Sequence, residues 1–203
     1  MGREADLKGI RAEIRGCTQC PLHRGRTKTV PGAGPMDALV MFIGEAPGFH
    51  EDQQGVPFVG AAGRFLNELL AQVGIDRKRV FITNVIKCRP PGNRDPLPGE
   101  VEACKDYLDR QIEAIRPQVI VTLGRHSMAM AFPEEKVSRV HGQVRQVGEQ
   151  VYFPMYHPAA ALHQPSLRGV VEADFQRLRD LLDGRVTPEV YTPPPEAEQL
   201  SLF

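Results

Sequence analysis

An apolar run followed by a loop rich in glycine and acids constrains the fold more than any other part of the sequence. Residues 38–43 (ALVMFI) are typical of a buried strand, and residues 64–73 of a helix. The segment between them, GEAPGFHEDQQGVPFVGAAG at 44–63, is typical of a loop. A strand that leads through a loop into a helix places that loop at the carboxyl end of a sheet, where open α/β folds bind ligands. We therefore expect a ligand site within residues 44–63.

The rest of the pattern predicts an α/β fold in three layers. We expect a central, mostly parallel sheet of four strands with helices on both faces. The expected strands are 38–43, 79–83 and 118–123, with a hairpin over 143–147 and 150–154. The expected helices are 3–15, 61–73, 98–115, 125–131 and 169–183, and a loop is expected to begin at His157-Pro158. The composition becomes rich in proline after Gly184, so residues 1–184 are predicted to form one domain and residues 185–203 a flexible tail.

Composition and charge limit the function classes. No apolar run is long enough to cross a bilayer, and the first residues lack the apolar core of a secretion signal, so we expect a cytoplasmic protein. We also expect a monomer. A formal net charge of zero argues against a protein that merely coats nucleic acid. Cations nevertheless crowd the N-terminal part, which permits local phosphate contacts, although charge alone favours an ordinary solvated surface. These cations are Arg11, Arg15, Arg24, Arg26 and Lys28.

The four cysteines indicate a metal site. Cys17 and Cys20 form a C-x2-C pair in a loop, whereas Cys88 and Cys104 are separated by fifteen residues around a proline-rich loop. Disulfides are not expected in a chain without an export signal. Four thiolates from two segments suit either zinc or an iron–sulfur cluster, and their spacing does not decide between the two. Four incidental thiols are the remaining alternative.

Four motifs then converge on one family: GEAPG at 44–48, EDQQGVPFVGAAG at 51–63, TNVIKCRPPGNRDP at 83–96 and HPA at 157–159. Together with the cysteines, they make the chain resemble the family-four uracil-DNA glycosylases, the iron–sulfur branch of that superfamily. The resemblance covers about residues 10–183. It implies a 4Fe–4S cluster held by Cys17, Cys20, Cys88 and Cys104. It also implies removal of uracil from DNA, with an abasic site left behind.

Four details compare the chain with members of that family and with related groups. Members often have glycine where Ala46 stands, and a leucine pair followed by arginine where this chain has AALH at 160–163. A related group links covalently to DNA through a histidine after the second strand, but CRPPGNRDPLPGE at 88–100 contains no histidine. Another branch lacks an acid after the first motif glycine, and Glu45 argues against it.

The resemblance assigns the reading of the base to two residues. Phe58 would stack on the extruded uracil. The amide of Asn84 offers both a donor and an acceptor, so it can pair with uracil O4 and N3–H, a pattern that cytosine reverses. Without the resemblance, a core phenylalanine and a turn-forming asparagine are the plainer interpretations.

The resemblance assigns the chemistry to acids and a histidine. Glu51 would lie beside the C5 edge and obstruct the thymine methyl group, while the backbone at Gly44 and Ala46 lies against the base. His157 would contact uracil O2 and stabilise the charge that develops on the departing base. Glu45 is the candidate to orient the attacking water. A hydrogen-bonded loop histidine is the plainer interpretation of His157 alone.

Weaker expectations concern DNA and a partner protein. Arg89 and Arg94 lie between the cysteines and could meet phosphates, and Leu162 is the nearest apolar candidate to wedge into the duplex. The chain ends Gln199-Leu200-Ser201-Leu202-Phe203, which resembles the pentapeptide that binds the bacterial sliding clamp. The alternative is a terminus that folds back onto the domain.

Two other function classes stay open from the residues alone. One is a non-catalytic, zinc-bearing nucleic-acid module that uses the basic face and the thiolates. The other is an electron-transfer protein, in which an acid-lined loop with Phe58 and Asn84 would have no use. Colour separates the first class from a glycosylase, because an iron–sulfur protein is brown and a zinc protein is colourless.

Overall fold

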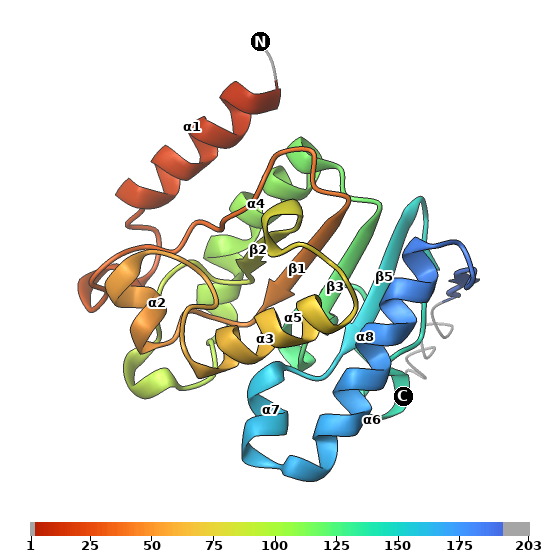
Figure 1. Cartoon of the computed structure of the whole chain (residues 1–203). Coiled ribbons are helices and arrows are strands. Elements are labelled where there is room, and N and C mark those ends of the chain that lie inside the picture. Colours follow the sequence, from red (N-terminus) through yellow and green to blue (C-terminus); the bar gives the residue numbers. More distant parts are fainter. Residues whose placement is uncertain (1–2, 193–203) are drawn as a thin grey trace, which may run out of the picture.

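The computed structural model describes residues 3–192 and contains a mixed sheet of six strands between layers of helices (Figure 1). The strand order is β2-β1-β3-β5-β4-β6. Neighbours are parallel except β4 and β5, which form an antiparallel hairpin. The strands are β1 (Val40–Gly44), β2 (Phe81–Asn84), β3 (Val119–Leu123), β4 (Arg145–Val147), β5 (Gln150–Met155) and β6 (Glu189–Val190).

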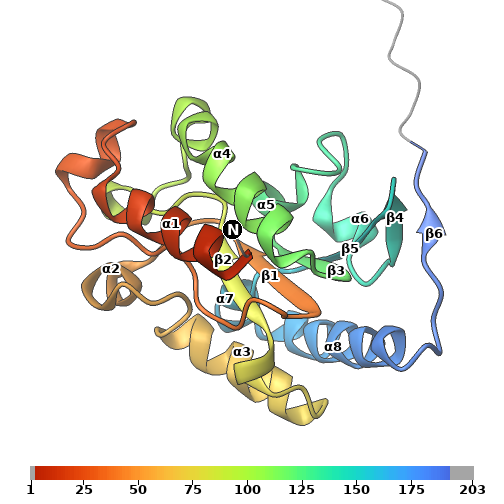
Figure 2. The same ribbon diagram turned by 90° about the horizontal axis from the view of Figure 1, so that it is seen from above.

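Helices cover both faces of the sheet, as Figure 2 shows from above. They are α1 (Arg3–Gly16), α2 (Phe49–Gln54), α3 (Ala61–Gln72), α4 (Pro98–Ile115), α5 (Arg125–Met128), α6 (Val137–Val140), α7 (Pro158–His163) and α8 (Arg168–Leu182). Single 3₁₀ turns occur at Pro21–Arg24, Arg77–Arg79, Pro91–Asn93 and Pro165–Leu167. Among the described residues, no helix has the length and apolar character needed to cross a membrane.

The central strands are buried on both faces because their side chains alternate between two cores. Val40 and Phe42 of β1 pack with residues of α3 and α8, and the Phe42 ring stacks 6.0 Å from that of Phe175. Met41 and Ile43 point the other way and pack with residues of α1 and α4. Burial on both faces explains why β1 is a continuous apolar run, as in parallel sheets generally. The predicted α/β architecture is confirmed.

The sheet has two features that the sequence analysis missed. It has six strands where a four-stranded sheet was predicted, because both hairpin strands and β6 join it. β6 lies within residues 185–203, which were predicted to form a flexible tail. The backbone of Tyr191 donates to Gln146, and its ring lies 4.8 Å from that of Phe132. An aromatic ring with packing partners therefore holds the start of this segment against the sheet. The clamp-like pentapeptide at 199–203 lies outside the described residues.

Several short helices also differ from the prediction. α2 and α6 were not predicted, α7 replaces the loop expected after His157, and the helix predicted over 125–131 ends at Met128. These helices span only four to six residues. They are too short to show a repeating apolar period, so local end signals define them. Gly55, for example, ends α2 with a left-handed φ of 75°, which glycine adopts readily.

Candidate active site

The loops that follow β1, β2 and β5 meet in a pocket of about 470 Å³ at the carboxyl edge of the parallel strands, here called the edge pocket. Residues predicted for substrate binding, catalysis or DNA contact that line it are Glu45, Ala46, Glu51, Phe58, Asn84, Arg94 and His157. The remaining lining residues are Pro47, Gly48, Ala62, Pro90, Asn93, Ala159 and His163. The fold thus brings together predicted residues that lie far apart in the sequence.

Phe58 forms a fixed wall of the edge pocket. Its backbone has a left-handed φ of 54°, which is rare for an aromatic residue and characteristic of functional sites. A Cβ at Gly63 would collide with the backbone of Phe58, and a Cβ at Gly44 would collide with its ring. The ring is 5.5 Å from that of His157, with an angle of 30° between the planes. Phe58 belongs to the core and to the pocket at the same time.

Asn84 offers the edge pocket a buried acceptor. It is the last residue of β2, lies opposite Gly44 in the register and is 1% exposed. Its Oδ1 is buried and has no hydrogen-bond partner among the described residues. Leaving such an atom unpaired costs about 1–3 kcal/mol, so it favours a ligand that brings a donor.

Lys87, which the sequence analysis missed, supports Asn84 from behind. The fully buried ammonium donates to Asn84 O at 2.7 Å, to Thr83 Oγ1 at 2.8 Å and to Gln111 Oε1 at 2.9 Å. Burial lowers its pKa to about 7. Because Lys87 directly precedes Cys88, it connects the asparagine to the cysteine segment.

Two adjacent acids of α2 hold two different loops. Glu51 accepts hydrogen bonds at one carboxylate oxygen from the N–H groups of Val59 (2.9 Å) and Gly60 (2.8 Å), and so fixes the loop that carries Phe58. Asp52 is buried and accepts from Thr27 N–H at 2.9 and 3.1 Å. α2 therefore joins the edge pocket to the basic N-terminal loop.

His157 is held as a neutral donor. It precedes α7 as the N-cap, and its Nδ1 accepts a hydrogen bond from Ala159 N–H at 3.1 Å. An accepting Nδ1 places the ring proton on Nε2. Burial lowers the pKa of His157 to about 4, although nearby Glu51 acts in the opposite direction. At neutral pH the ring therefore carries one proton, on the nitrogen that is not used by the backbone.

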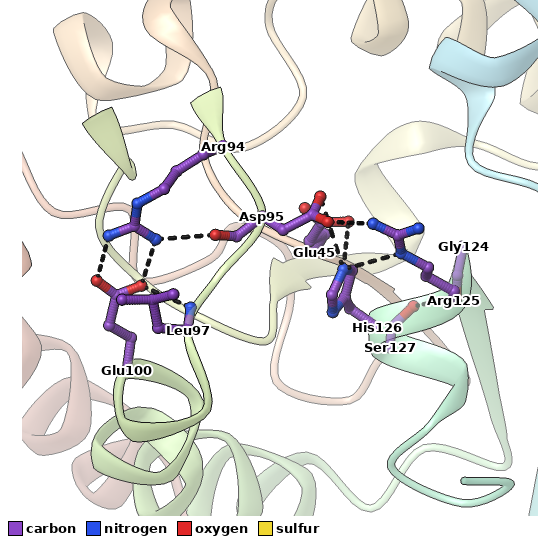
Figure 3. A network of polar contacts seen from close by, with 9 residues as sticks. All are labelled: Glu45, Arg94, Asp95, Leu97, Glu100, Gly124, Arg125, His126 and Ser127. Carbon is purple, nitrogen blue, oxygen red and sulfur yellow. Dashed lines mark hydrogen bonds and ion pairs between the residues drawn. The ribbon is translucent and has the colours of Figure 1, made fainter. Parts of the chain in front are cut away.

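Glu45 belongs to a charged network with Asp95, Arg125 and His126, shown in Figure 3. The Glu45 carboxylate is 3.6 Å from His126 Nε2, which also lies 3.8 Å from Asp95 and 3.1 Å from Arg125 Nε. Arg125 also pairs with Asp95. Burial raises the pKa of Glu45; His126 and Arg125 oppose this rise, and Asp95 adds to it. The three partners of Glu45 were missed because Asp95 was seen only as part of the motif at 83–96, and the short α5 carries no recognisable motif.

The predicted DNA-contacting residues surround the edge pocket. Arg94 donates two hydrogen bonds to the buried carboxylate of Glu100, at 2.7 and 2.9 Å. Arg89 donates to Asn93 at 2.6 Å and lies 5.1 Å above the ring of Phe49. Leu162 on α7 is 45% exposed, next to a residue that lines the pocket. Their contacts with DNA stay predictions.

The four cysteines line one small pocket between α1 and α4. Cys88 and Cys104 are buried, and Cys17 and Cys20 are half-buried. Burial raises the pKa of Cys104 to about 11 and raises that of Cys88. Arg26 donates to the sulfur of Cys88 at 3.2 Å. Four converging thiols with a cation beside them are a donor set that fits a metal or cluster carrying thiolate ligands.

Comparison with known proteins identifies the family. Residues 31–181 match the model of the uracil DNA glycosylase superfamily, and the chain belongs to that superfamily.

Its curated relatives narrow this to the type-4 branch. The chain is similar to a type-4 uracil-DNA glycosylase of Archaeoglobus fulgidus, with 49% identity over 91% of this chain and 97% of the relative. It is also similar to type-4 uracil-DNA glycosylases of Sulfurisphaera tokodaii and Thermotoga maritima. The Sulfurisphaera tokodaii protein is 47% identical over 92% of this chain and 88% of its own length. The Thermotoga maritima protein is 42% identical over 89% of this chain and 96% of its own length. The resemblance seen in the motifs is confirmed.

Proposed function

We propose that this protein hydrolyses the N-glycosidic bond of deoxyuridine in DNA, releases uracil and leaves an abasic site. The observation that carries the proposal is the buried, unpaired Oδ1 of Asn84 in the edge pocket. Uracil N3–H is a donor of the right kind for this atom. The activity named for the type-4 relatives supports the same conclusion.

The edge pocket suits a flat, uncharged base that has left the helix. A uracil inside a duplex cannot reach the pocket, so it must first be extruded. Phe58 then provides the stacking wall, and the Asn84 amide pairs with N3–H and O4. Cytosine reverses this donor and acceptor pattern, and each buried group left unpaired would cost about 1–3 kcal/mol.

Glu51 is our candidate to exclude thymine. Its carboxylate is fixed by Val59 and Gly60 and lines the edge pocket, so it cannot move aside freely. Placed beside the C5 edge, it would obstruct the methyl group that distinguishes thymine. The backbone at Gly44 and Ala46 would close the pocket against the base.

Bond cleavage needs a stabilised leaving group and an oriented water. His157 would donate from Nε2 to uracil O2, where negative charge develops as the bond to the sugar breaks. Such a donor lowers the barrier more than it strengthens ground-state binding. The Glu45 carboxylate would orient the water and take its proton as the oxygen bonds to C1′. The proton thus passes to Glu45, and the bonding electrons leave with the base.

The direct test is incubation with an oligonucleotide that contains one deoxyuridine, followed by alkali. Abasic sites break under alkali, so strand cleavage at the uracil position is the expected result. An intact strand would refute the proposed activity. A matched oligonucleotide with thymidine at the same position is the control.

We also propose a 4Fe–4S cluster held by Cys17, Cys20, Cys88 and Cys104. When bound, the cluster would tie the segment after α1 to α4 and serve a structural purpose. Arg26 would stabilise the negative charge of the thiolates. A brown protein that absorbs near about 400 nm supports this, since that is typical of an iron–sulfur chromophore. A colourless protein with one zinc would contradict it. Iron removal should weaken folding and DNA binding more than the chemical step.

The C-terminal residues 199–203 are our candidate for binding a sliding clamp. Two leucines and a phenylalanine at the end of a polar segment could enter an apolar pocket on a partner, and tethering would raise their effective concentration. Deleting Gln199–Phe203 should abolish clamp binding and spare excision on short oligonucleotides. Unchanged clamp binding would refute this role. We expect the protein itself to be a monomer.

A further inference from the structure

A second pocket, of about 700 Å³, lies between α1, the segment that follows it and the end of α2, and we call it the basic pocket. Its lining includes Arg11, Arg15, His23, Arg26 and Lys28. Within the described part of the chain, no carboxylate lines it. In both Figure 1 and Figure 2 the segment after α1 runs beside α2. None of the family motifs includes these cations.

Several cations of the basic pocket have no carboxylate partner among the described residues. Among the described residues, neither Arg15 nor Lys28 forms an ion pair or a side-chain hydrogen bond, and both are exposed. The Nε of Arg11 is buried and also lacks a hydrogen-bond partner. By contrast, many arginines elsewhere pair with carboxylates, among them Arg94, Arg110, Arg145, Arg179 and Arg185.

The basic pocket is also preformed. Arg11 donates from Nη2 to Gly34 O at 3.3 Å and lies 5.6 Å from the Phe81 ring, so its guanidinium is fixed. The carboxylate of Asp52 holds Thr27, the residue between Arg26 and Lys28, through the backbone N–H. Asp52 itself is buried and does not line the pocket. A fixed guanidinium beside exposed cations that have no carboxylate partner is suited to an anion with several oxygens, such as a phosphate.

The position of the basic pocket relative to the edge pocket suggests which phosphates of the DNA it could bind. Glu51 of α2 lines the edge pocket, whereas Gln54 and Gly55, at the other end of the same helix, line the basic pocket. Glu51 and Gln54 are three positions apart, which is about 4.5 Å along a helix axis. One strand of DNA carries a phosphate about every 3.4 Å along the axis. Both pockets therefore adjoin one short helix, close enough for neighbouring phosphates of a single DNA strand to reach the basic pocket while the base lies in the edge pocket.

We propose that the basic pocket binds backbone phosphates of the DNA strand beside the extruded uracil, a few nucleotides from the lesion. This inference rests on the proposed function, because it takes the edge pocket as the uracil site. On a protein of zero net charge, such a local site can hold DNA where general electrostatic attraction is weak. Phosphate contacts of this kind position the strand without reading its sequence.

The test compares two double variants of the full chain. Arg15→Gln/Lys28→Gln removes two exposed cations of the basic pocket. Lys136→Gln/Arg139→Gln removes two exposed cations near α6 that line neither pocket and serves as the matched control. Affinity for a long uracil-containing oligonucleotide is measured as a function of salt. The salt slope of the first variant should become less steep by about 0.7–0.9 for each contact removed, and that of the control should not change.

Truncated substrates and free phosphate show whether the basic pocket binds the DNA backbone or inorganic phosphate. Two oligonucleotides are compared, one shortened on the 5′ side of the uracil and one on the 3′ side. The affinity difference between Arg15→Gln/Lys28→Gln and the unaltered protein should disappear with one of them and persist with the other. Equal salt slopes for both variants would overturn the proposal. So would tight binding of inorganic phosphate that Arg15→Gln/Lys28→Gln abolishes without any effect on DNA. Failure of uracil release would refute the proposed function instead, and the salt slopes would still be measurable.

Discussion

The edge pocket and the basic pocket share α2 but present opposite chemistry. The edge pocket carries Glu45, Glu51, an aromatic ring, a neutral histidine and an arginine paired with Glu100, whereas the basic pocket carries cations without carboxylate partners. The difference teaches that charge is divided between two tasks. An uncharged base and a developing anion need fixed dipoles and few cations, while a phosphate backbone needs cations. Adjacent residues of α2, Glu51 and Asp52, hold both parts together.

The largest expected effect in the edge pocket comes from Glu45→Gln. Loss of the carboxylate removes the acceptor for the water proton, so the rate of excision should fall by about 10²–10⁴-fold. Binding to the uracil-containing strand should persist, because the basic pocket is untouched. Single-turnover rates and binding before turnover measure the two effects separately. Near-normal turnover would remove Glu45 from this role.

His157→Ala should lower the rate nearly as much. Removing one donor to a developing anion typically costs about 2.7–4 kcal/mol in the barrier. The ring also packs against Phe58, so thermal stability must be measured beside the single-turnover rate. A stable variant with an unchanged rate would contradict the assignment of His157.

Asn84→Leu should have a smaller effect, mainly on which base is accepted. The substitution removes the buried amide, so uracil loses the partner of its N3–H, at a cost of about 1–3 kcal/mol. Single-turnover rate divided by dissociation constant, measured for uracil and for cytosine, gives the discrimination. If discrimination between the two bases stayed the same, Asn84 would not be the reader of the base edge.

The pH dependence of the excision rate distinguishes Glu45 from His157. A shift of its acid limb is the smallest effect that we expect on the rate. Burial raises the pKa of Glu45 above its ordinary value, whereas the pKa of His157 is lowered to about 4. As pH falls, Glu45 is therefore protonated first, and its protonation should set the acid limb of the rate. His126 lowers the pKa of Glu45, so His126→Gln should move this limb to higher pH. A limb that did not move would argue against the coupling.

The lowered pKa of His157 also predicts how the stability of the protein depends on pH. An unfolded histidine titrates near about 6.5, whereas folded His157 titrates at about 4. The unfolded state therefore binds the proton more readily, and the free energy of unfolding should fall as pH drops from about 6.5 to about 4. His157→Gln should flatten this decline, as measured by denaturant titration at several pH values.

The sequence predicted the layers of the fold and most of the edge pocket for identifiable reasons. Residues 38–43 form an apolar run whose strand, from Val40 on, is buried, and parallel strands bring the ends of such runs to one edge, so Glu45 and Asn84 could be expected to meet. The position of His157 at a helix N-cap could not be expected, because a helix of six residues has no visible period. Asp95 and His126 escaped notice because only tertiary packing brings them to Glu45.

The basic pocket also could not be predicted from the sequence alone. The cations from Arg11 to Lys28 were visible as a cluster in the sequence, but charge alone favoured a solvated surface. Only the structure shows that most of them line a pocket beside α2 and that no carboxylate is among its described lining residues. The strand at Glu189–Val190 depends likewise on Tyr191 finding the ring of Phe132. Such contacts form between distant segments and have no local signature.

The most direct test of the account is release of free base from three matched oligonucleotides with deoxyuridine, thymidine or deoxycytidine at one position. The account predicts release of uracil alone, with thymine and cytosine at background, because the Asn84 amide and the fixed Glu51 carboxylate define the accepted base edge. Release of thymine or cytosine at a rate comparable to uracil, or no release of uracil by the intact protein, would contradict it.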